Sequence, residues 1–453
     1  MRVHFIAIGG SAMHNLAIAL HLKGFTVSGS DDEIFEPSYT RLNKYGLLPE
    51  NIGWDSKKIT DDIQAVILGM HARADNPELL EAQRKNIKIY SYPEFLFEQS
   101  KHKMRVVIGG SHGKTTITSM ILHVLQIVGF KTDYMVGAQL DGFEVMVKLS
   151  ESAKWMVMEG DEYLTSPIDR VPKFLHYHPN IAVISGIGWD HINVFPTFEN
   201  YVHQFKLFID CIEPEGSLIF FEDDIEVTKL AEHSAVKKLP YSIHPHHVEH
   251  GVTIIHDADT SYKLSIFGRH NMANLSAAHL VCKEMGVSDE HFYNAISSFK
   301  GASRRLELFA SNGDSFIYRD FAHAPSKVKA SIIALKEQFS EKKIIACLEL
   351  HTFSSLSEGF INQYRNSLDA ADVAIVFYDP HAVALKRLPE ISFQRLREAF
   401  GREDLYLFSN KEQLISFLLN QKDLSDVYAF MSSGSFNGLD LNKLSNELGI
   451  TSI

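Results

Sequence analysis

The sequence contains little cysteine and no long apolar run. Only three of its 453 residues are cysteine, and they are far apart, at Cys211, Cys282 and Cys347. An odd number of scattered cysteines argues against a disulfide framework and is typical of a reducing compartment. The chain has no run of about 18 apolar residues, so we expect no membrane span. Its first residues, MRVHFIAIGG, lack the apolar region and small-residue cleavage site of a signal peptide, so we expect a cytoplasmic protein.

Basic charge is also scarce. The chain has 44 lysine and arginine residues against 56 aspartate and glutamate residues, which gives a net charge of −12. Because proteins that bind nucleic acids usually present a basic surface, we expect no nucleic-acid partner. Hydrophobic residues make up 45% of the chain, a normal share for a globular protein with full cores. The length favours about three domains.

Apolar runs and helical patterns alternate along the whole chain, which predicts an α/β fold. In the first part, apolar runs at residues 3–8 and 64–70 follow this alternation, with a helical pattern at residues 11–25. The polar stretch EQSKHKM, residues 98–104, marks a domain boundary, and a third set of strands starts near residue 300. We therefore predict three domains, at residues 1–100, 101–300 and 301–453.

The stretch VVIGGSHGKTT, residues 106–116, is the most specific motif. A strand pattern precedes it and an amphipathic helix pattern follows it, as in phosphate-binding loops of the type G-x-x-x-x-G-K-[ST]. Glycines let the backbone curl round an anion at the positive end of a helix. Lys114 would neutralise phosphate charge, and Thr115 would bind Mg²⁺ through its hydroxyl. An ordinary glycine turn is the alternative, but the flanking elements favour a nucleotide site made of Gly110, Ser111, His112, Gly113, Lys114, Thr115 and Thr116.

Acidic residues follow two later strand patterns. Glu159, Asp161 and Glu162 come after the apolar run WMVM, and Asp190 and His191 come after IAVI. In an open parallel sheet the ligand lies at the carboxyl ends of the strands, so these groups could converge on a metal beside the loop. For either cluster alone, loop residues facing water are the simpler interpretation.

A histidine-rich stretch, HPHHVEHG at residues 244–251, is less informative than it looks. It has no cysteine or carboxylate partner at a spacing typical of zinc sites. We therefore predict a solvated loop between strands.

Together these motifs resemble the Mur ligases, ATP-dependent amide-forming enzymes of peptidoglycan synthesis, over nearly all of the chain. The loop GSHGKTT fits the shortened loop of that family, and Ile108 stands where the family lacks the first glycine of the usual signature. Glu159 resembles the family's metal-binding glutamate, and His191 resembles the metal-binding histidine of its D-H pair. The resemblance implies Rossmann-like first and third domains and a P-loop ATPase-like central domain.

Three further motifs follow in the family's order. HNMANL resembles the adenine-binding motif, with His270, Asn271 and Asn274. RRLE resembles the segment whose second arginine, here Arg305, reaches the γ-phosphate from the third domain. DFAHAP resembles the segment whose aspartate, here Asp320, holds the ribose. Any one of these motifs is weak evidence, but their common order strengthens the resemblance.

The resemblance implies a reaction in two steps. A substrate carboxylate takes the γ-phosphate of ATP and becomes an acyl phosphate, and an amine then attacks its carbonyl. Lys114, Arg305 and His191 would be the catalytic residues, and Thr115, Glu159 and His191 would bind Mg²⁺. Lys206 lies about one residue from the place where several family members carry a carbamoylated lysine.

The first domain implies the identity of one substrate. AIGGSAM, at residues 7–13, resembles the branch of the family that binds UDP-N-acetylmuramoyl substrates, where Gly9 and Gly10 would let the backbone approach the diphosphate. We expect the protein to be a monomer or a weak dimer. The expected substrate-binding residues are Gly9, Gly10, Ser11, Ala12, Met13, Asp31, His71, His323, His351, Ser433 and Gly434.

That branch contains a ligase that adds L-alanine and a recycling ligase that attaches the tripeptide L-alanyl-γ-D-glutamyl-meso-diaminopimelate. Segments at residues 29–47, 161–179 and 431–440 resemble the recycling ligase, which we therefore favour. The L-alanine ligase is the first alternative. A nucleotide-sugar-binding regulator without ligase activity is the second, and a folate-type polyglutamate ligase, which lacks the first domain, is the third.

Some positions depart from the family's patterns. Gly186 and Gly188 stand in the segment before the D-H pair, and Ala324 replaces the second histidine of the ribose segment. The loop after the CLEL strand has His351 but no arginine, whereas both branches carry an arginine there that can hold the incoming carboxylate. These departures put the amine substrate in question.

Overall fold

The computed structural model divides the chain into two compact units. The first holds residues 1–244 and 273–296, and the second holds residues 245–272 and 297–453. Among the described residues, no helix is long and apolar enough to cross a membrane. The structure describes residues 1–70, 72–137, 139–140, 142–166, 169–189, 194–302, 305–389, 391–421 and 426–451.

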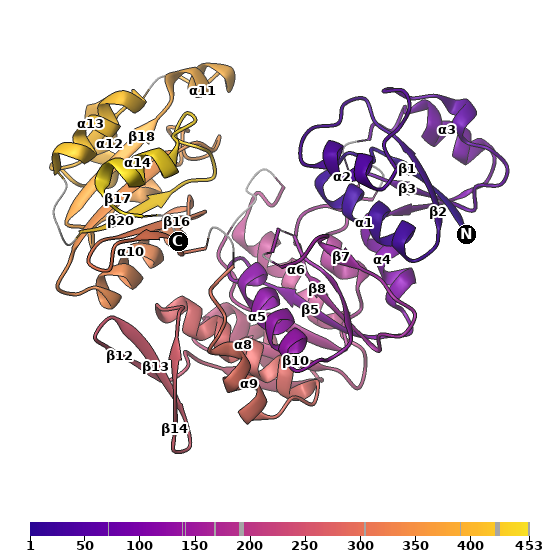
Figure 1. The fold of residues 1–453 in the computed structure, drawn as a ribbon. Coiled ribbons are helices and arrows are strands. Elements are labelled where there is room, and N and C mark those ends of the chain that lie inside the picture. The colour runs from indigo at the N-terminus through magenta and orange to yellow at the C-terminus, as the bar shows by residue number, and fades with distance from the viewer. Residues whose placement is uncertain are drawn as a thin grey trace. The chain divides into compact units, whose positions relative to one another are not determined.

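The first unit begins with a four-stranded parallel sheet in the order β2-β1-β3-β4 (Figure 1). Its central strands carry the predicted apolar runs and are almost fully buried, as expected for parallel strands covered on both faces. The strands are β1 (Arg2–Ile6), β2 (Thr26–Ser30), β3 (Ala65–Leu68) and β4 (Lys88–Ser91). The helices are α1 (Ser11–Leu22), α2 (Ser38–Lys44), α3 (Pro77–Arg84) and α4 (Tyr92–Ser100), with a 3₁₀ turn η1 at Ser56–Lys58.

The second sheet of this unit has seven strands in the order β11-β10-β9-β5-β8-β6-β7, and all pairs but β6–β7 are parallel. Strand β5 lies between β8 and β9, so the polar segments that follow these three strands share one edge. The strands are β5 (Met104–Gly109), β6 (Thr132–Met135), β7 (Val147–Lys148), β8 (Trp155–Glu159), β9 (Ile181–Ile184), β10 (Ser217–Phe221) and β11 (Lys237–Tyr241). The helical segments are α5 (Lys114–Ile127), η2 (Lys173–His176), α6 (Phe198–Asp210), α7 (Ile225–Glu232) and α9 (Asp289–Ile296).

Arg105 ties the end of α4 to the second sheet. Its Nη1 donates to the carbonyl oxygens of Ser100, Lys101 and Lys103 at 2.9–3.2 Å, and its Nη2 donates to Glu213 Oε1 at 2.8 Å. The first three of these acceptors lie at the carboxyl end of α4 or just after it, where helical carbonyls lack intrahelical partners. One buried guanidinium therefore satisfies the helix end and joins it to the second sheet.

The second unit contains a small antiparallel sheet in the order β12-β13-β14. Its strands are β12 (His246–Glu249), β13 (Val252–Asp257) and β14 (Thr260–Leu264). The prediction of a loop at residues 244–251 was therefore wrong for the part that forms β12. That edge strand is mostly exposed, so it lacks the apolar pattern of a buried strand, and its His247 ring stacks on His256 at 5.2 Å.

The larger sheet of the second unit has six strands in the order β15-β16-β20-β17-β18-β19, with only β15 antiparallel to its neighbour (Figure 1). Its strands are β15 (Glu307–Ser311), β16 (Phe316–Asp320), β17 (Lys343–Leu350), β18 (Val373–Tyr378), β19 (Tyr406–Phe408) and β20 (Asp426–Met431). Its helical segments are α10 (Pro325–Gln338), η3 (Ile361–Tyr364), α11 (Pro380–Leu385), α12 (Phe393–Phe400), α13 (Lys411–Gln421) and α14 (Leu441–Leu448). The boundary between the units falls within α8 (Arg269–Glu284). The predicted α/β class is confirmed, since three of the four sheets are parallel or nearly so.

Candidate active site

The phosphate loop connects β5 to α5, as the motif predicts. Gly110 and Gly113 adopt φ angles of +122° and +82°, which L side chains rarely take. A Cβ atom at Gly113 would also lie 2.3 Å from Oδ1 of Asn274, and one at Gly110 would lie 2.3 Å from Oγ of Ser185. Both glycines are therefore required by backbone conformation and by packing.

Lys114, the first residue of α5, is nearly buried and paired with a buried carboxylate. Its Nζ donates to Gly110 O and to Glu162 Oε2, each at 2.7 Å. Glu162 is 1% exposed and also accepts a hydrogen bond from the Tyr201 hydroxyl at 3.1 Å. Burial alone would lower the pKa of Lys114, but Glu162, with Asp161 and Glu159, outweighs it and raises that pKa above its ordinary value. Lys114 is therefore a fixed cation at the mouth of the loop.

Thr115 and Glu159, two of the expected metal ligands, lie within hydrogen-bond distance of each other. The Thr115 hydroxyl donates to Glu159 Oε1 at 2.9 Å, and the backbone N–H of Gly137 donates to Oε2 at 3.0 Å. A hydroxyl and a carboxylate are the oxygen ligands that Mg²⁺ takes beside a nucleotide. The third expected ligand, His191, and its neighbour Asp190 lie outside the described residues.

The three acids after β8 serve three different partners. Glu159 faces Thr115, Glu162 faces Lys114, and Asp161 points into the segment that follows. Asp161 accepts from Lys173 Nζ at 2.6 Å through Oδ2, and its backbone carbonyl accepts from the N–H of Phe174 at 3.1 Å. The simpler interpretation of water-facing loop acids does not hold for Glu162, which is almost fully buried.

The segment after Glu162 forms a hairpin, which we call the 163–173 hairpin. The N–H of Thr165 donates to Val171 O at 3.0 Å, and the N–H of Lys173 donates to Tyr163 O at 3.0 Å. Residues 167 and 168 lie outside the described residues. The hairpin therefore begins directly after Glu162, the acid that pairs with Lys114.

The adenine motif lies on α8. Asn274 is buried, and its Oδ1 lies against Gly113 of the phosphate loop. Asn271 is also buried and donates through Nδ2 to Phe267 O at 2.9 Å. Burial lowers the pKa of His270 to about 4, so its ring is neutral at pH 7.

In the second unit, Arg305 lies just before β15, and Asp320 is the last residue of β16. The Arg305 guanidinium lies over the Phe321 ring, with its Cζ 5.2 Å from the ring centre. Asp320 is 7% exposed and accepts from the Ala322 N–H at 3.2 Å and from the Ser331 hydroxyl. Burial raises the pKa of Asp320, although Ser331 and Arg305 oppose that shift. The nearby His323 ring lies 2.8 Å from Phe321 O through Nδ1.

The structure brings His351 and Gly434 together beside a residue that the motifs did not identify. Glu349, near the end of β17, is 2% exposed, and its Oε2 accepts from the Ser432 hydroxyl and from the Phe436 N–H. Nδ1 of His351 lies 3.9 Å from Glu349 Oε1.

Gly434 packs directly on this pair, because a Cβ there would lie 2.7 Å from Glu349 Oε2 and from His351 Nδ1. Oγ of Ser433 is buried and has no hydrogen-bond partner among the described residues. An acid inside the otherwise apolar strand CLEL was the sequence signal that could have pointed to Glu349.

In the first domain, two of the expected substrate-binding residues, Gly9 and Asp31, are joined by a hydrogen bond. The Gly9 N–H donates to Asp31 Oδ2 at 2.7 Å, and burial raises the pKa of Asp31. Ser11 and Ala12 are exposed at the start of α1, whereas Met13 is 5% exposed and packs in the core. Gly10 has its backbone in an extended conformation just before α1. The remaining expected substrate residue, His71, lies outside the described residues.

Two further placements bear on the site. His14, which the motifs did not identify, is 1% exposed, and its Nδ1 lies 2.9 Å from Gly10 O and 3.0 Å from Ser38 Oγ. Burial lowers the pKa of His14. Lys206 is exposed on α6 and pairs with Asp210 at 2.7 Å, so its amine is engaged by a carboxylate of its own helix.

Three family models match the chain in sequence order. "Mur ligase family, catalytic domain" matches residues 2–104, "Mur ligase middle domain" matches residues 108–282, and "Mur ligase, glutamate ligase domain" matches residues 304–434. Together they span nearly all of the chain.

Relatives in sequence carry two different substrate names. A UDP-N-acetylmuramate–L-alanine ligase of Caldicellulosiruptor bescii is 34% identical over 454 residues, covering 96% of this chain and 96% of the relative. The UDP-N-acetylmuramate–L-alanyl-γ-D-glutamyl-meso-2,6-diaminoheptandioate ligase of Escherichia coli K12 is 28% identical, covering 97% and 96%.

Solved structures show the same fold over the whole chain. A murein peptide ligase from Psychrobacter arcticus has a TM-score of 0.63 at 21% identity, covering 99% of both chains. The UDP-N-acetylmuramate–alanine ligase from Thermotoga maritima has a TM-score of 0.67 at 20% identity, covering 99% of this chain and 98% of the other. At such identities the likeness supports the architecture alone.

Proposed function

The chain belongs to the Mur ligase family, and from that premise we propose that it joins UDP-N-acetylmuramate to a murein peptide that begins with L-alanine. As a member of the family it is an ATP-dependent, amide-forming ligase of peptidoglycan synthesis with three domains. The proposed acceptor is the recycled tripeptide L-alanyl-γ-D-glutamyl-meso-diaminopimelate. Because ATP and a UDP-sugar are its substrates, we place the enzyme in the cytoplasm.

The proposed reaction balances in two steps. An oxygen of the muramate carboxylate bonds to the γ-phosphorus of ATP, the bond to the bridging oxygen breaks, and ADP leaves. The amine nitrogen of the acceptor then bonds to the carbonyl carbon, the carbon–oxygen bond to phosphate breaks, and the amine loses a proton. Lys114 and, by family resemblance, Arg305 stabilise the charge of the transferring phosphoryl group.

The residues beside the loop fit a magnesium ion. Thr115 and Glu159 already lie within hydrogen-bond distance of each other, and Gly137 orients the carboxylate through its N–H. When bound, Mg²⁺ would neutralise charge on the β- and γ-phosphates. Glu162, by contrast, is committed to Lys114, so we assign it to positioning that lysine rather than to the metal.

The 163–173 hairpin is the observation that carries the proposal of a peptide acceptor. Its base is tied by Asp161, and it begins directly after Glu162, which holds Lys114, so it stands next to the phosphate loop. A free amino acid needs only a small pocket at the reacting carbonyl, whereas a peptide extends away from it. The paired residues of the hairpin at this place lengthen the wall along which a peptide can lie.

The charge of the third domain supports the same acceptor. Residues 351–364, which follow the end of β17 and begin with His351, contain neither lysine nor arginine, and the cation paired with this segment, Arg395, is engaged by Glu358 and Asn362. Free L-alanine carries its carboxylate beside the reacting amine and would need a cation there. In a peptide an amide replaces that carboxylate. The acceptor side of the site therefore suits a peptide better than free alanine.

The L-alanine ligase remains the second candidate, because the relative at 34% identity is named for that reaction. The regulator without activity is disfavoured by the intact contacts of Lys114 with Glu162 and of Thr115 with Glu159. A chain that had lost catalysis would be under no pressure to keep these groups in place.

Steady-state kinetics separate the candidates. We expect kcat/KM at saturating ATP, Mg²⁺ and UDP-N-acetylmuramate to rise from free L-alanine through L-alanyl-γ-D-glutamate to the tripeptide. A higher kcat/KM for free alanine would reassign the protein as the L-alanine ligase. Absence of turnover with all three would favour the regulator.

A further inference from the structure

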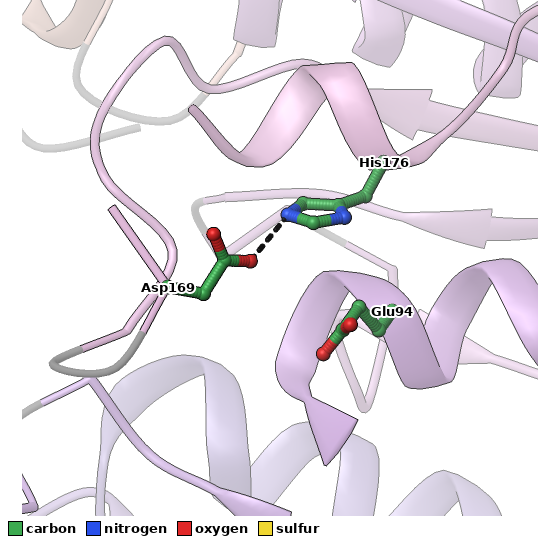
Figure 2. Close-up of side chains that lie close together, drawn as sticks. All are labelled: Glu94, Asp169 and His176. Atoms are coloured by element: carbon green, nitrogen blue, oxygen red, sulfur yellow. Dashed lines mark ion pairs between the residues drawn. The ribbon is translucent and has the colours of Figure 1, made fainter. Parts of the chain in front are cut away.

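A group of three potential metal ligands lies away from the phosphate loop, where the 163–173 hairpin meets α4 (Figure 2). Glu94 comes from the first turn of α4, Asp169 from the hairpin, and His176 from the end of η2. One ligand atom of each residue lies within 4.8 Å of the other two, and all three side chains are partly buried. Three separate segments of the chain thus present an imidazole and two carboxylates to one place.

The imidazole of His176 supplies a second, independent observation. Its Nε2 is shielded from solvent and lies 2.8 Å from Asp169 Oδ2. Within the described part of the chain, however, this nitrogen makes no hydrogen bond, so the close contact is not aligned as one. The ring nitrogen and the carboxylate oxygen therefore lie side by side without a well-aligned hydrogen bond, an arrangement in which both atoms can turn toward a shared metal ion.

The two carboxylates are already oriented by hydrogen bonds on one side. The N–H of Val171 donates to Oδ1 of Asp169 at 3.1 Å, which leaves Oδ2 toward His176. The N–H and the hydroxyl of Ser91 both donate to Oε2 of Glu94, each at 2.7 Å. Outer hydrogen bonds of this kind are what orients carboxylate ligands in metal sites.

We propose that Glu94, Asp169 and His176 bind a zinc ion that ties the 163–173 hairpin to α4. One imidazole nitrogen and two carboxylate oxygens form a donor set suited to Zn²⁺, and three protein ligands leave one position for water. Zinc bonds of about 2.0–2.1 Å place tetrahedral ligand atoms about 3.3 Å apart. Side-chain rotations that move the ligand atoms by about 1–2 Å would therefore be enough to bind the ion.

Zinc at this place would hold the hairpin at a second point. The base is tied by Lys173 to Asp161, and the ion would tie Asp169, near the tip, to α4. If the hairpin guides the acceptor peptide, a role that rests on the proposed function, zinc would favour that peptide without touching the reacting atoms. The binding of zinc itself is independent of ligase activity.

The test is a zinc titration of the metal-free, full-length protein against a chromophoric chelator. We expect one equivalent of zinc, which an excess of Mg²⁺ does not displace. His176→Gln, Asp169→Asn and Glu94→Gln should each lower the affinity by more than about 100-fold, above the loss usual for outer partners of metal ligands. Glu94→Gln keeps a side-chain oxygen for the capping box with Ser91, so α4 should remain folded.

Two control variants cover the other places where zinc could bind. His247→Gln removes one ring of the stacked His247–His256 pair, and Glu159→Gln removes a ligand of the proposed magnesium site. Both should keep the zinc equivalent. Its loss in either control, or equal zinc binding by wild type and His176→Gln, would overturn the proposal.

A crystal of the zinc-loaded wild type gives a result that does not depend on any variant. Anomalous diffraction at the zinc edge should show one peak between Glu94, Asp169 and His176. A peak elsewhere, or none, would contradict the assignment. Since neither experiment measures turnover, failure of the ligase assignment would leave these results unchanged.

Discussion

The phosphate loop and the end of strand β17 are both built at the carboxyl ends of parallel strands, but they differ in how their residues are gathered. The loop is one short segment in which glycine positions and a helix start fix the geometry. The β17 site combines Glu349, His351 and the 432–436 segment, which are far apart in the sequence. A motif can therefore predict the first site in full. In the second, motifs pointed to His351, Ser433 and Gly434, whereas only tertiary pairing reveals Glu349.

Removal of Lys114 should have the largest effect. We expect Lys114→Ala to lower kcat by at least about 1,000-fold, because a fixed cation at the transferring phosphoryl group is lost. The substitution also leaves Glu162 buried without its cation.

The matched control for that stability effect is Lys114→Ala with Glu162→Gln. We expect the double variant to recover the thermal midpoint but not the turnover. Normal ATP-dependent ligation by either variant would contradict the assignment of the loop as the site that binds the phosphates of ATP.

Arg305 should give the next largest effect. We expect Arg305→Ala to lower kcat about 100- to 1,000-fold while ATP binding stays largely in place, because its proposed contact strengthens only during phosphoryl transfer. Two measurements on the variant check this prediction: kcat, which should fall, and the dissociation constant of ADP, which should stay nearly unchanged. Loss of nucleotide affinity with unchanged kcat would make Arg305 a ground-state binder instead.

The β17 site can be probed through its packing. We expect Gly434→Ala to raise the KM of the acceptor about tenfold and to destabilise the protein by about 1–3 kcal/mol, because the new Cβ would overlap Glu349 and His351. Gly359→Ala is the matched control, since no atom lies within 4 Å of its added Cβ. If both substitutions change the acceptor KM equally, the β17 site does not contribute to acceptor binding.

His270, in the first turn of α8, should make stability depend on acid. Its folded pKa of about 4 lies below the ordinary value of 6.5, so the unfolded chain binds the extra proton first as the pH falls. The free energy of unfolding should therefore drop by up to about 3 kcal/mol between pH 6.5 and pH 4. Urea midpoints of His270→Gln should show a smaller drop over this range, and an identical drop would contradict a ring that is neutral in the folded protein.

Much of the fold followed from the sequence, because the buried parallel strands are continuous apolar runs. The shorter or more polar strands β6, β7, β11 and β19 carry no such signal, and β12 looked like a loop because it is an exposed edge. These strands are set by pairing with neighbours that the sequence pattern does not identify.

Within the candidate site, the sequence predicted the residue types better than their partners. It grouped Glu159, Asp161 and Glu162 as one acidic cluster. In the structure each carboxylate has its own partner, which is Thr115, Lys173 and Lys114, respectively. The role of His191 remains a prediction from the motif. Glu349 was missed because an acid in an apolar strand becomes informative only when its hydrogen-bond donors are known.

The central claim is that the carboxylate of UDP-N-acetylmuramate is activated by ATP before the amine attacks. The most direct measurement uses UDP-N-acetylmuramate whose carboxylate carries oxygen-18, with ATP, Mg²⁺ and the tripeptide. Because the carbon–oxygen bond breaks when the amide forms, the account predicts one labelled oxygen in each phosphate released, detected by mass spectrometry. Turnover that releases unlabelled phosphate would contradict an acyl phosphate and, with it, the assigned reaction.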